Sequence, residues 1–333
     1  MNKLTVTIIA LLLFTLFSAI AGLSFGPADL SNNQILQCMV GQCPDQISQM
    51  VIWQVRVPRV LVALVAGMGL AIAGAILQNT TRNPLADPYL FGIVSGAGLG
   101  ATVANLSLSG IGLAKPLAIA LPLAAFLGAL FAIVIVLVIA KVLQRMEQLL
   151  LTGVAVSFML AAITQFILYF GEPFATNRVI FWLMGSLSRV EMSNFYIIAT
   201  VLFITLFIIT ALHRQIDALL LGDESAASLG VNVDKLRLLM LALCAALTAT
   251  IVAYCGGIGF VGLMIPHIVR QIIGVTTLKL VIGSALIGGS FLIWVDIIAR
   301  SALANAEIPI GIITSALGSI FFLFIMVKTR NIN

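Results

Sequence analysis

Few side chains in this sequence could carry out chemistry, and those few are scattered. Its 333 residues include two histidines, four cysteines and twelve acids, while 61% are hydrophobic. His267 follows a proline in a short apolar segment, where a packed, hydrogen-bonded ring is a better interpretation than a ligand. His213 ends an apolar run and is interpreted as a helix-terminus cap. The sequence contains no catalytic triad, no metal-ligand cluster and no phosphate-binding GxxxxGK[ST] loop. A membrane-embedded enzyme is therefore the weakest hypothesis.

The cysteines fall into two pairs with different expected roles. Four residues separate Cys38 from Cys43 in a polar stretch between two apolar runs, and Gly41 can turn the chain back. So short a loop can bring two Cα atoms within the roughly 4.4–6.8 Å that a disulfide needs. We predict a Cys38–Cys43 disulfide; the alternative is two free thiols in a mobile loop. Cys244 and Cys255 lie within an apolar run, where packing is the default role.

The elements that must position these residues are membrane helices. The mean hydropathy is +1.18 and only 9% of residues are charged, which excludes an ordinary soluble domain. Long apolar runs recur, as in membrane-spanning helices. About ten spans are expected, at residues 4–24, 60–79, 89–108, 116–140, 149–170, 192–212, 236–255, 265–274, 280–298 and 308–327. The fold class predicted is an all-α integral membrane protein with one transmembrane domain over residues 1–333.

Two segments do not fit simple spans. Residues 265–274 are too short to cross a membrane alone, and four glycines between positions 256 and 262 precede them. Glycine-broken backbone at membrane depth is tolerated only inside protein or beside a water-filled cavity. Residues 171–189 are also too short and polar to span, so we expect an interfacial helix with Trp182 at the membrane surface.

The distribution of basic residues predicts the orientation. With the N-terminus inside, eleven Lys and Arg lie on the cytoplasmic side and six on the other, as the positive-inside rule requires. Both termini are then cytoplasmic, and the net charge of +5 is no argument for nucleic-acid binding. Residues 19–21 resemble a signal-peptide cleavage site. The topology nevertheless needs this first run as a span.

The polar segment 213–237 interrupts the apolar runs on the cytoplasmic side. Asp223 is expected to cap a helix of about two turns, and Gly230 to take the left-handed position after it. Glu224 lies in the first turn, where the helix dipole favours an acid. Because so short a helix is marginal alone, we expect it to dock on another protein. The alternative is an ordinary amphipathic loop.

Six strings, in one order, carry a resemblance to a known family. They are WQVRVPR (53–59), RNPLADPYLFG (82–92), GDESAASLG (222–230), GFVGLMIPHIVR (259–270), DIIAR (296–300) and EIPIGIITSALG (307–318). Over nearly its whole length the chain resembles the FecCD family, the permease subunits of vitamin B12, haem and iron–siderophore ABC importers. The resemblance implies a vitamin B12 permease-like fold of ten spans, the type II importer architecture.

The resemblance also implies partners. Two copies of the subunit, or this chain and a homologous permease, would enclose one pathway in a bacterial inner membrane. Two ATPase subunits would bind ATP and Mg on the cytoplasmic side, and a periplasmic binding protein would deliver cargo. No cofactor, metal or nucleic acid is expected on this chain. The short helix would couple it to the ATPase through Leu221, Gly222, Asp223, Glu224, Ala226, Ala227, Leu229 and Gly230.

Arginines mark the predicted outer side. Arg56 and Arg59 flank a proline there, and Arg300 lies on the same side. The resemblance implies that they dock acidic residues of the binding protein, and the planar guanidinium suits bidentate contact with carboxylates. The alternative is solvation or contact with lipid headgroups. Asp296 and Glu307 lie near the same boundary, where a structural or docking role is expected rather than proton coupling.

The resemblance assigns a cytoplasmic gate as well. Asn83 and Leu85 would form part of it, although a simple proline turn is the alternative. Met146 and Glu147, the other predicted gate residues, align where the vitamin B12 permease has small hydroxyl residues, so the gate departs from that pattern here. Cobalamin or an oxyanion such as molybdate remains an alternative cargo. An ion-coupled secondary transporter would explain the broken helix but not the capped one.

Overall fold

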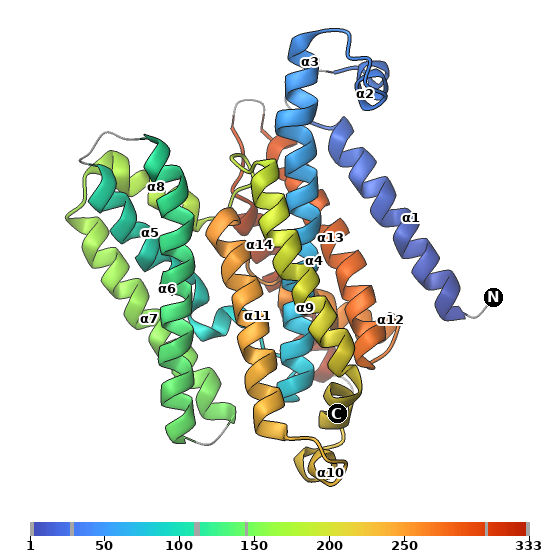
Figure 1. The fold of residues 1–333 in the computed structure, drawn as a ribbon, viewed down its shortest axis with the longest axis vertical. Helices are drawn as coiled ribbons and strands as arrows, with labels where there is room; N and C mark the ends of the chain where they lie inside the picture. The colour runs from blue at the N-terminus through green and yellow to red at the C-terminus, as the bar shows by residue number, and fades with distance from the viewer. Residues whose placement is uncertain (1–2, 27–29, 110–113, 144–145, 304–305, 331–333) are drawn as a thin grey trace.

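The computed structural model describes residues 3–26, 30–109, 114–143, 146–303 and 306–330, and these ranges contain helices and no strands. Most of the long helices run along one direction (Figure 1). The helices are α1 (Lys3–Ser24), α2 (Asn32–Met39), α3 (Gln46–Met50), η1 (Val51–Arg56), α4 (Val57–Thr81), η2 (Pro88–Phe91), α5 (Ile93–Ser109), α6 (Ala114–Leu143), α7 (Met146–Tyr169), α8 (Pro173–Leu183), α9 (Met192–Leu219), α10 (Asp223–Ser228), α11 (Val233–Cys255), α12 (Val261–Ile272), α13 (Thr277–Ser301) and α14 (Ile310–Arg330).

The predicted spans have counterparts in these helices. Seven helices of the described chain are long and apolar enough to cross a membrane, and three shorter apolar helices lie at residues 93–107, 261–272 and 310–325. The third span was expected from residue 89 but begins at Ile93. Asp87 caps the short 3₁₀ helix η2, which ends at the left-handed Gly92 (φ 76°), and the chain turns before α5 starts.

The centre of the bundle is α4, in which nearly every residue is buried. Small residues let its backbone approach its neighbours. A Cβ on Gly67 would lie 2.2 Å from the carbonyl oxygen of Gly288 on α13, and one on Gly74 would lie 1.9 Å from that of Gly262 on α12. Helix association in lipid depends on such close packing. Gly96 and Gly100 on α5 make the same close approach to α6, as their GxxxG spacing predicts.

The glycine-rich break between α11 and α12 lies inside the protein. Gly256 has a φ of 71°, and a Cβ there would lie 2.1 Å from the carbonyl oxygen of Trp182 at the end of α8. Phe260 also has a positive φ, 67°, before α12 begins. The amide of Ser186 donates to the carbonyl oxygen of Cys255 at 2.9 Å. One carbonyl group at the end of α11 is therefore hydrogen-bonded outside its own helix. The sequence had left two places for this backbone, inside protein or beside a water-filled cavity, and the contacts of Gly256 and Cys255 correspond to the first.

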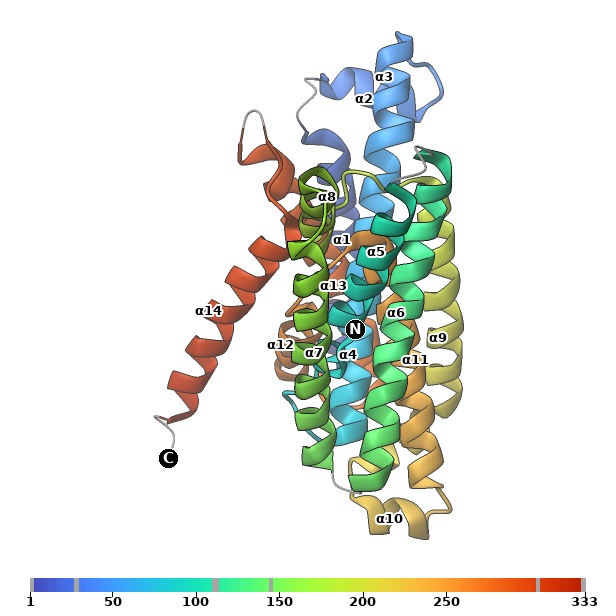
Figure 2. The same ribbon diagram turned by 90° about the vertical axis from the view of Figure 1, so that its left-hand side faces the viewer.

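The last helix, α14, diverges from the bundle. It packs against α12 and α13 but leans away from the long helices along its length (Figure 2). Much of its apolar surface is exposed, including Ile320, Leu323 and Phe324. A surface of this composition must face lipid or another protein.

Candidate functional site

The short helix α10 lies at one end of the molecule, beyond the ends of the long helices (Figure 1). Gly222, with a φ of 109°, occupies the N-cap position, so the expectation that Asp223 caps the helix is wrong: Asp223 is its first residue. The C-terminal end is as predicted, because Gly230 has a φ of 83°. Val231 N–H donates to Ala226 O and Gly230 N–H to Ala227 O, which is the Schellman motif.

The surface of α10 divides into a buried and an exposed part. Ala226 is completely buried where α10 packs on α9 and α11. Leu221 and Leu229, one at each end of the helix, are 68% and 66% exposed. Ala227 is exposed between them. The helix therefore presents apolar side chains outward while its backbone is fixed by its own hydrogen bonds.

Asp223 forms ion pairs instead of capping the helix. Its Oδ1 accepts from Nη2 of Arg82 at 2.8 Å and from Nη2 of Arg237 at 3.0 Å. Arg82 follows the last residue of α4 in a left-handed conformation (φ 51°), and Arg237 lies near the start of α11. Nε of Arg237 also donates to the carbonyl oxygen of Thr80 at 3.3 Å. Sequence reasoning missed both pairs; Arg82 is 141 residues from Asp223 in the chain and Arg237 is 14 residues away.

The turn after α4 brings together two of the four predicted gate residues. Asn83 Oδ1 accepts from the amide of Leu85 at 2.9 Å, and the side chain of Leu85 is about half exposed. The side chains of Met146 and Glu147 lie outside the described part of the structure. Next to the turn, Asp87 is buried and its Oδ1 accepts from the amide of Tyr89. Burial raises the pKa of Asp87 to about 6. The gate itself stays a prediction.

A second polar cluster, not foreseen from the sequence, links α4 to α12. Arg270 donates to Oε1 of Gln78 and, at 3.0 Å, to Oδ1 of Asn79. Nε2 of Gln78 donates to the carbonyl oxygen of Gly262 at 3.0 Å. Polar side chains inside apolar runs were the available signal, because a buried polar group needs a hydrogen-bonding partner.

The three arginines at the opposite end are buried rather than presented to solvent. Arg56, Arg59 and Arg300 are 2%, 4% and 3% exposed. Arg59 Nε donates to Oδ1 of Asp296 at 2.7 Å, and its two terminal nitrogens donate to the two carboxylate oxygens of Glu307 at 2.9 Å each. Arg300 Nε lies 3.2 Å from the other oxygen of Asp296. A charge at this depth needs an opposite charge or hydrogen bonds, and this chain supplies both.

Two of these arginines also bind the end of α1. Arg56 Nη1 donates to the carbonyl oxygens of Leu23 and Ser24, at 2.6 and 3.1 Å. Arg300 Nη2 donates to that of Gly22 at 2.6 Å. The final carbonyls of a helix have no partner within the helix and carry its negative dipole end, so guanidinium groups suit this position. Docking on a partner protein stays a prediction for these residues.

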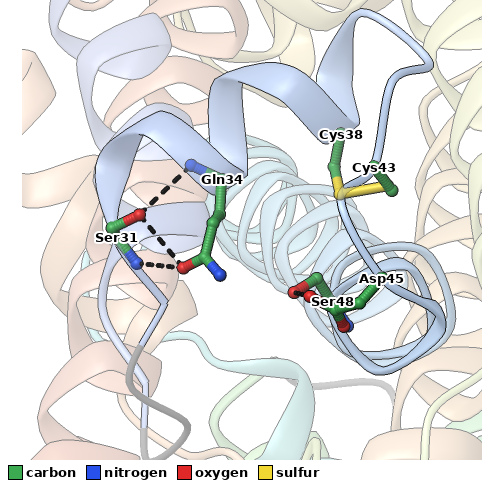
Figure 3. Close-up of a disulfide and its surroundings, with 6 residues drawn as sticks. All are labelled: Ser31, Gln34, Cys38, Cys43, Asp45 and Ser48. Atoms are coloured by element: carbon green, nitrogen blue, oxygen red, sulfur yellow. Dashed lines mark hydrogen bonds between the residues drawn. A yellow bond between two sulfur atoms is a disulfide. The ribbon is translucent and has the colours of Figure 1, made fainter.

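Residues 30–56 fold into a small cap beyond this end. Cys38 and Cys43 form a disulfide (Figure 3), and Gly41 between them has a φ of 84°. The disulfide lies over a small core in which Ile35, Cys38 and Ile52 are buried. The two unpaired cysteines, Cys244 and Cys255, are buried in the main core.

Local hydrogen bonds fix both helices of the cap. Ser31 and Gln34 form a capping box at the start of α2 (Figure 3). Asp45 starts α3, accepting from the amide of Ser48 at 2.7 Å and from its hydroxyl at 2.8 Å. The hydrogen bond from the backbone of Ser48 lowers the pKa of Asp45. The cap is therefore an ordered unit and not a flexible connection.

An apolar depression lies between α5, α7 and α8, and the sequence did not single it out. Its walls include Val94, Gly98, Gln165, Tyr169 and Leu183. Among the described residues, no group of three or more His, Cys, Asp or Glu could hold a metal ion. Most of the side chains that line the depression are apolar, and they do not identify a cargo.

Comparison with known proteins identifies the family to which the chain belongs. A model of the FecCD transport family matches residues 11–328. An Fe(3+)-citrate import system permease protein of Bacillus subtilis is 35% identical over 97% of this chain and 94% of its own length. A vitamin B12 import system permease protein of Escherichia coli is 36% identical over 85% of each.

A solved structure agrees with these relatives. An inward-facing conformation of a metal-chelate type ABC transporter superposes with a TM-score of 0.84 at 31% identity, covering 97% of this chain and 99% of that chain. The six strings, the break before α12 and the short helix α10 thus occur in a chain that matches one family of membrane permeases over residues 11–328. The chain belongs to the FecCD transport family, the permeases of ABC importers.

Proposed function

We propose that this chain is the transmembrane permease subunit of an ABC importer that moves a metal chelate from periplasm to cytoplasm. The proposed cargo is a ferric siderophore, haem or cobalamin, and ATP is hydrolysed with Mg²⁺ on separate ATPase subunits. The observation that carries the proposal is α10. This short helix is closed at its C-terminal end by the Schellman hydrogen bonds, and Leu221 and Leu229 on either side of it are exposed beyond the membrane bundle. A rigid element of this kind can transmit displacement between subunits.

The proposed assembly contains two ATPase subunits, a periplasmic binding protein and a second permease, either a copy of this chain or a homologue. The relatives are import-system permeases. The outward lean of α14 and its exposed apolar side chains support a permease–permease contact along this helix. Lipid would cover the remaining apolar surface of the bundle.

The proposed orientation places α10 in the cytoplasm of a bacterial cell, with the chain in the inner membrane. Most of the described Lys and Arg side chains outside the cap lie toward the α10 end, namely Arg82, Arg214, Lys235, Arg237, Arg270 and Lys279. The positive-inside rule puts such an end in the cytoplasm. Both termini would then be cytoplasmic, and the disulfide-bonded cap would lie in the periplasm, where disulfides persist.

Docking of the binding protein at Arg56, Arg59 and Arg300 remains part of the proposal. Since these guanidinium groups already contact atoms of this chain, acidic side chains of a partner would have to replace those contacts. The carboxylate of Glu307 is 36% exposed, whereas that of Asp296 is 1% exposed. A carboxylate of the binding protein can therefore replace Glu307 with less loss of solvent contact than it can replace Asp296. We expect replacement of Glu307 to be the first step of docking.

The cargo is the finer part of the proposal. The named relatives belong to import systems for vitamin B12 and Fe(3+)-citrate. Their names support a metal chelate as the cargo, and cobalamin is the alternative cargo for a permease of the same fold. An oxyanion such as molybdate is the next alternative. An ion-coupled secondary transporter is a different class, and it gives no role to the exposed leucines of α10.

One uptake experiment tests the proposal. The chain is reconstituted in liposomes with the ATPase and the binding protein that adjacent genes encode. Uptake of radiolabelled ferric siderophore, haem, cobalamin and molybdate is then measured. Uptake that requires ATP on the α10 side and survives a proton ionophore supports the importer. Uptake without ATP that the ionophore abolishes would identify a secondary transporter instead.

A further inference from the structure

A single carboxylate oxygen joins three elements at the α10 end. Oδ1 of Asp223 accepts from Arg82 at 2.8 Å and from Arg237 at 3.0 Å. Asp223 begins α10, Arg82 follows the last residue of α4, and Arg237 belongs to α11. We name these three residues the Asp223 clamp. Both guanidinium groups meet the same oxygen, so displacement of α10 acts on α4 and α11 together.

We infer that Asp223 is a positioning residue that transmits movement of α10 to the turn after α4. The inference rests on the proposed function, in which α10 receives the movement of the ATPase. Asp223 was expected only to cap the helix, and in the structure its side chain leaves the helix and binds the two arginines.

The clamp is not needed to form α10. The amide of Ala226 donates to the carbonyl oxygen of Gly222, and the Schellman hydrogen bonds close the other end at Gly230. The side chains of Arg82 and Asp223 are 42% and 46% exposed and that of Arg237 is 17% exposed, and an ion pair open to solvent contributes little to folding stability. The main consequence of losing the clamp is therefore in the orientation of α10, not in folding.

The glycines on either side of α10 leave its orientation free, so a contact such as the Asp223 clamp is needed to hold the helix in place. Gly222 and Gly230 have φ values of 109° and 83°, and a Cβ on Gly230 would meet nothing within 4 Å. Only Ala226 of the helix is buried. A helix joined through two glycines and held by one small side chain can tilt. The ion pairs of Asp223 oppose that tilt.

Beyond Arg82, contacts continue into the bundle. The turn at Asn83 and Leu85 follows directly, and Gln78, four residues before Arg82, binds both Arg270 and the carbonyl oxygen of Gly262. Polar contacts thus join the end of α4 to both the first and the last turn of α12. Movement of α10 that passes through the clamp should therefore be detectable at the turn after α4, which a direct measurement of coupling tests.

The test uses a thiol at the turn as reporter. All four native cysteines are either buried or disulfide-bonded, so Leu85→Cys introduces the one readily reactive thiol. The permease is reconstituted with its ATPase subunits, and the rate of maleimide labelling at position 85 is measured with and without a non-hydrolysable ATP analogue and Mg²⁺. No cargo is required.

Two substitutions remove the clamp in different ways. Asp223→Asn removes the charge at nearly constant shape, and Arg82→Asn removes the guanidinium while keeping a residue that tolerates the left-handed conformation. Lys279→Gln is the matched control, because it removes an exposed charge at the same end of the molecule, in the first turn of α13. Asp223→Glu keeps a carboxylate within reach of the arginines.

In the parent complex, nucleotide should change the labelling rate by at least about fivefold, the lower end of usual coupling between sites. Asp223→Asn and Arg82→Asn should lose most of that change. Arg82 lies outside α10, so in Arg82→Asn the ATPase should still co-purify and hydrolyse ATP. Lys279→Gln should respond as the parent does, and Asp223→Glu should recover part of the response.

Three results would overturn the clamp. The first is an equal response in parent and clamp variants, and the second is a parent that binds its ATPase but shows no response at position 85. The third is loss of the ATPase from both clamp variants, which would make the clamp residues part of the contact surface. Failure of the parent itself to bind any ATPase contradicts the proposed function instead, so the two failures are distinguishable.

Discussion

Arg59 holds both carboxylate oxygens of Glu307, each at 2.9 Å, and its Nε holds Asp296 at 2.7 Å. One side chain of α4 thereby ties α13 to the segment that enters α14. The bidentate geometry is the strongest arrangement available to an arginine and a carboxylate. The two acids differ in environment, because Asp296 is buried and Glu307 is partly exposed.

Arg59→Met should therefore destabilise the protein strongly. It leaves Asp296 with one arginine fewer in a buried site, and breaking a buried pair in this way typically costs about 3–5 kcal/mol. Glu307→Gln should cost about 1 kcal/mol or less, because the lost partner is partly solvated. Thermal unfolding of the detergent-solubilised protein measures both. Arg189→Met, at an exposed arginine, is the control, and equal losses in Arg59→Met and Arg189→Met would contradict this assignment.

Gly230 is expected to tolerate only residues that adopt a left-handed conformation. Space is not limiting, since nothing lies within 4 Å of a Cβ at this position. Gly230→Val should disturb the Schellman closure, because a left-handed β-branched residue costs roughly 1–2 kcal/mol, whereas Gly230→Asn should be tolerated. ATP-dependent uptake and ATP hydrolysis by the assembled complex measure the effect. Equal transport by the Val and Asn variants would count against the role of this backbone conformation.

Local signals were enough to predict one end of α10 and not the other. Gly230 follows a short helical pattern, and a glycine in that place ends helices wherever it occurs. Asp223 has the side chain of an N-cap, but its position depends on Arg82, which is 141 residues away in sequence. A long-range ion pair of this kind leaves no local pattern.

The same distinction applies to the bundle. Apolar runs predicted the spans, and the glycines before α12 predicted the break in the helix. The partners of Arg59 could not be predicted, because charges near a membrane boundary look alike in sequence whether they face water or each other. The start of α5 was misplaced by four residues, since Asp87 and Pro88 build a 3₁₀ turn where an apolar pattern alone reads as continuous helix.

Asp87 should make stability depend on pH. Burial raises its pKa from 3.8 to about 6 in the folded protein. The contribution to stability is therefore complete below about pH 4 and is lost as pH rises through about 6, because the folded state then holds a buried charge. The full difference corresponds to about 3 kcal/mol. Asp87→Asn keeps an acceptor for the Tyr89 amide and cannot ionise, so it should remove this component.

Thermal unfolding of parent and Asp87→Asn between pH 4 and 8 tests the expectation. The melting temperature of the parent should fall relative to the variant as pH rises from 4 to 7. A constant difference between the two proteins across this range would mean that Asp87 does not titrate there.

The disulfide between Cys38 and Cys43 should be present in the mature protein and should matter locally. It closes a very short loop, so it can stabilise by at most about 2–3 kcal/mol. Its position over Ile35 and Ile52 holds the cap in one shape beside Arg56. The double variant Cys38→Ser, Cys43→Ser should therefore keep the bundle intact and loosen the cap, seen as faster proteolysis within residues 30–50.

Mass spectrometry decides whether the bond forms. In denatured, unreduced protein, Cys244 and Cys255 should take up an alkylating reagent, while Cys38 and Cys43 should do so only after reduction. The two core cysteines thus serve as an internal control for reagent access. Alkylation of all four cysteines before reduction, in protein purified from the membrane without reductant, would show that the loop carries free thiols and that another contact orders the cap.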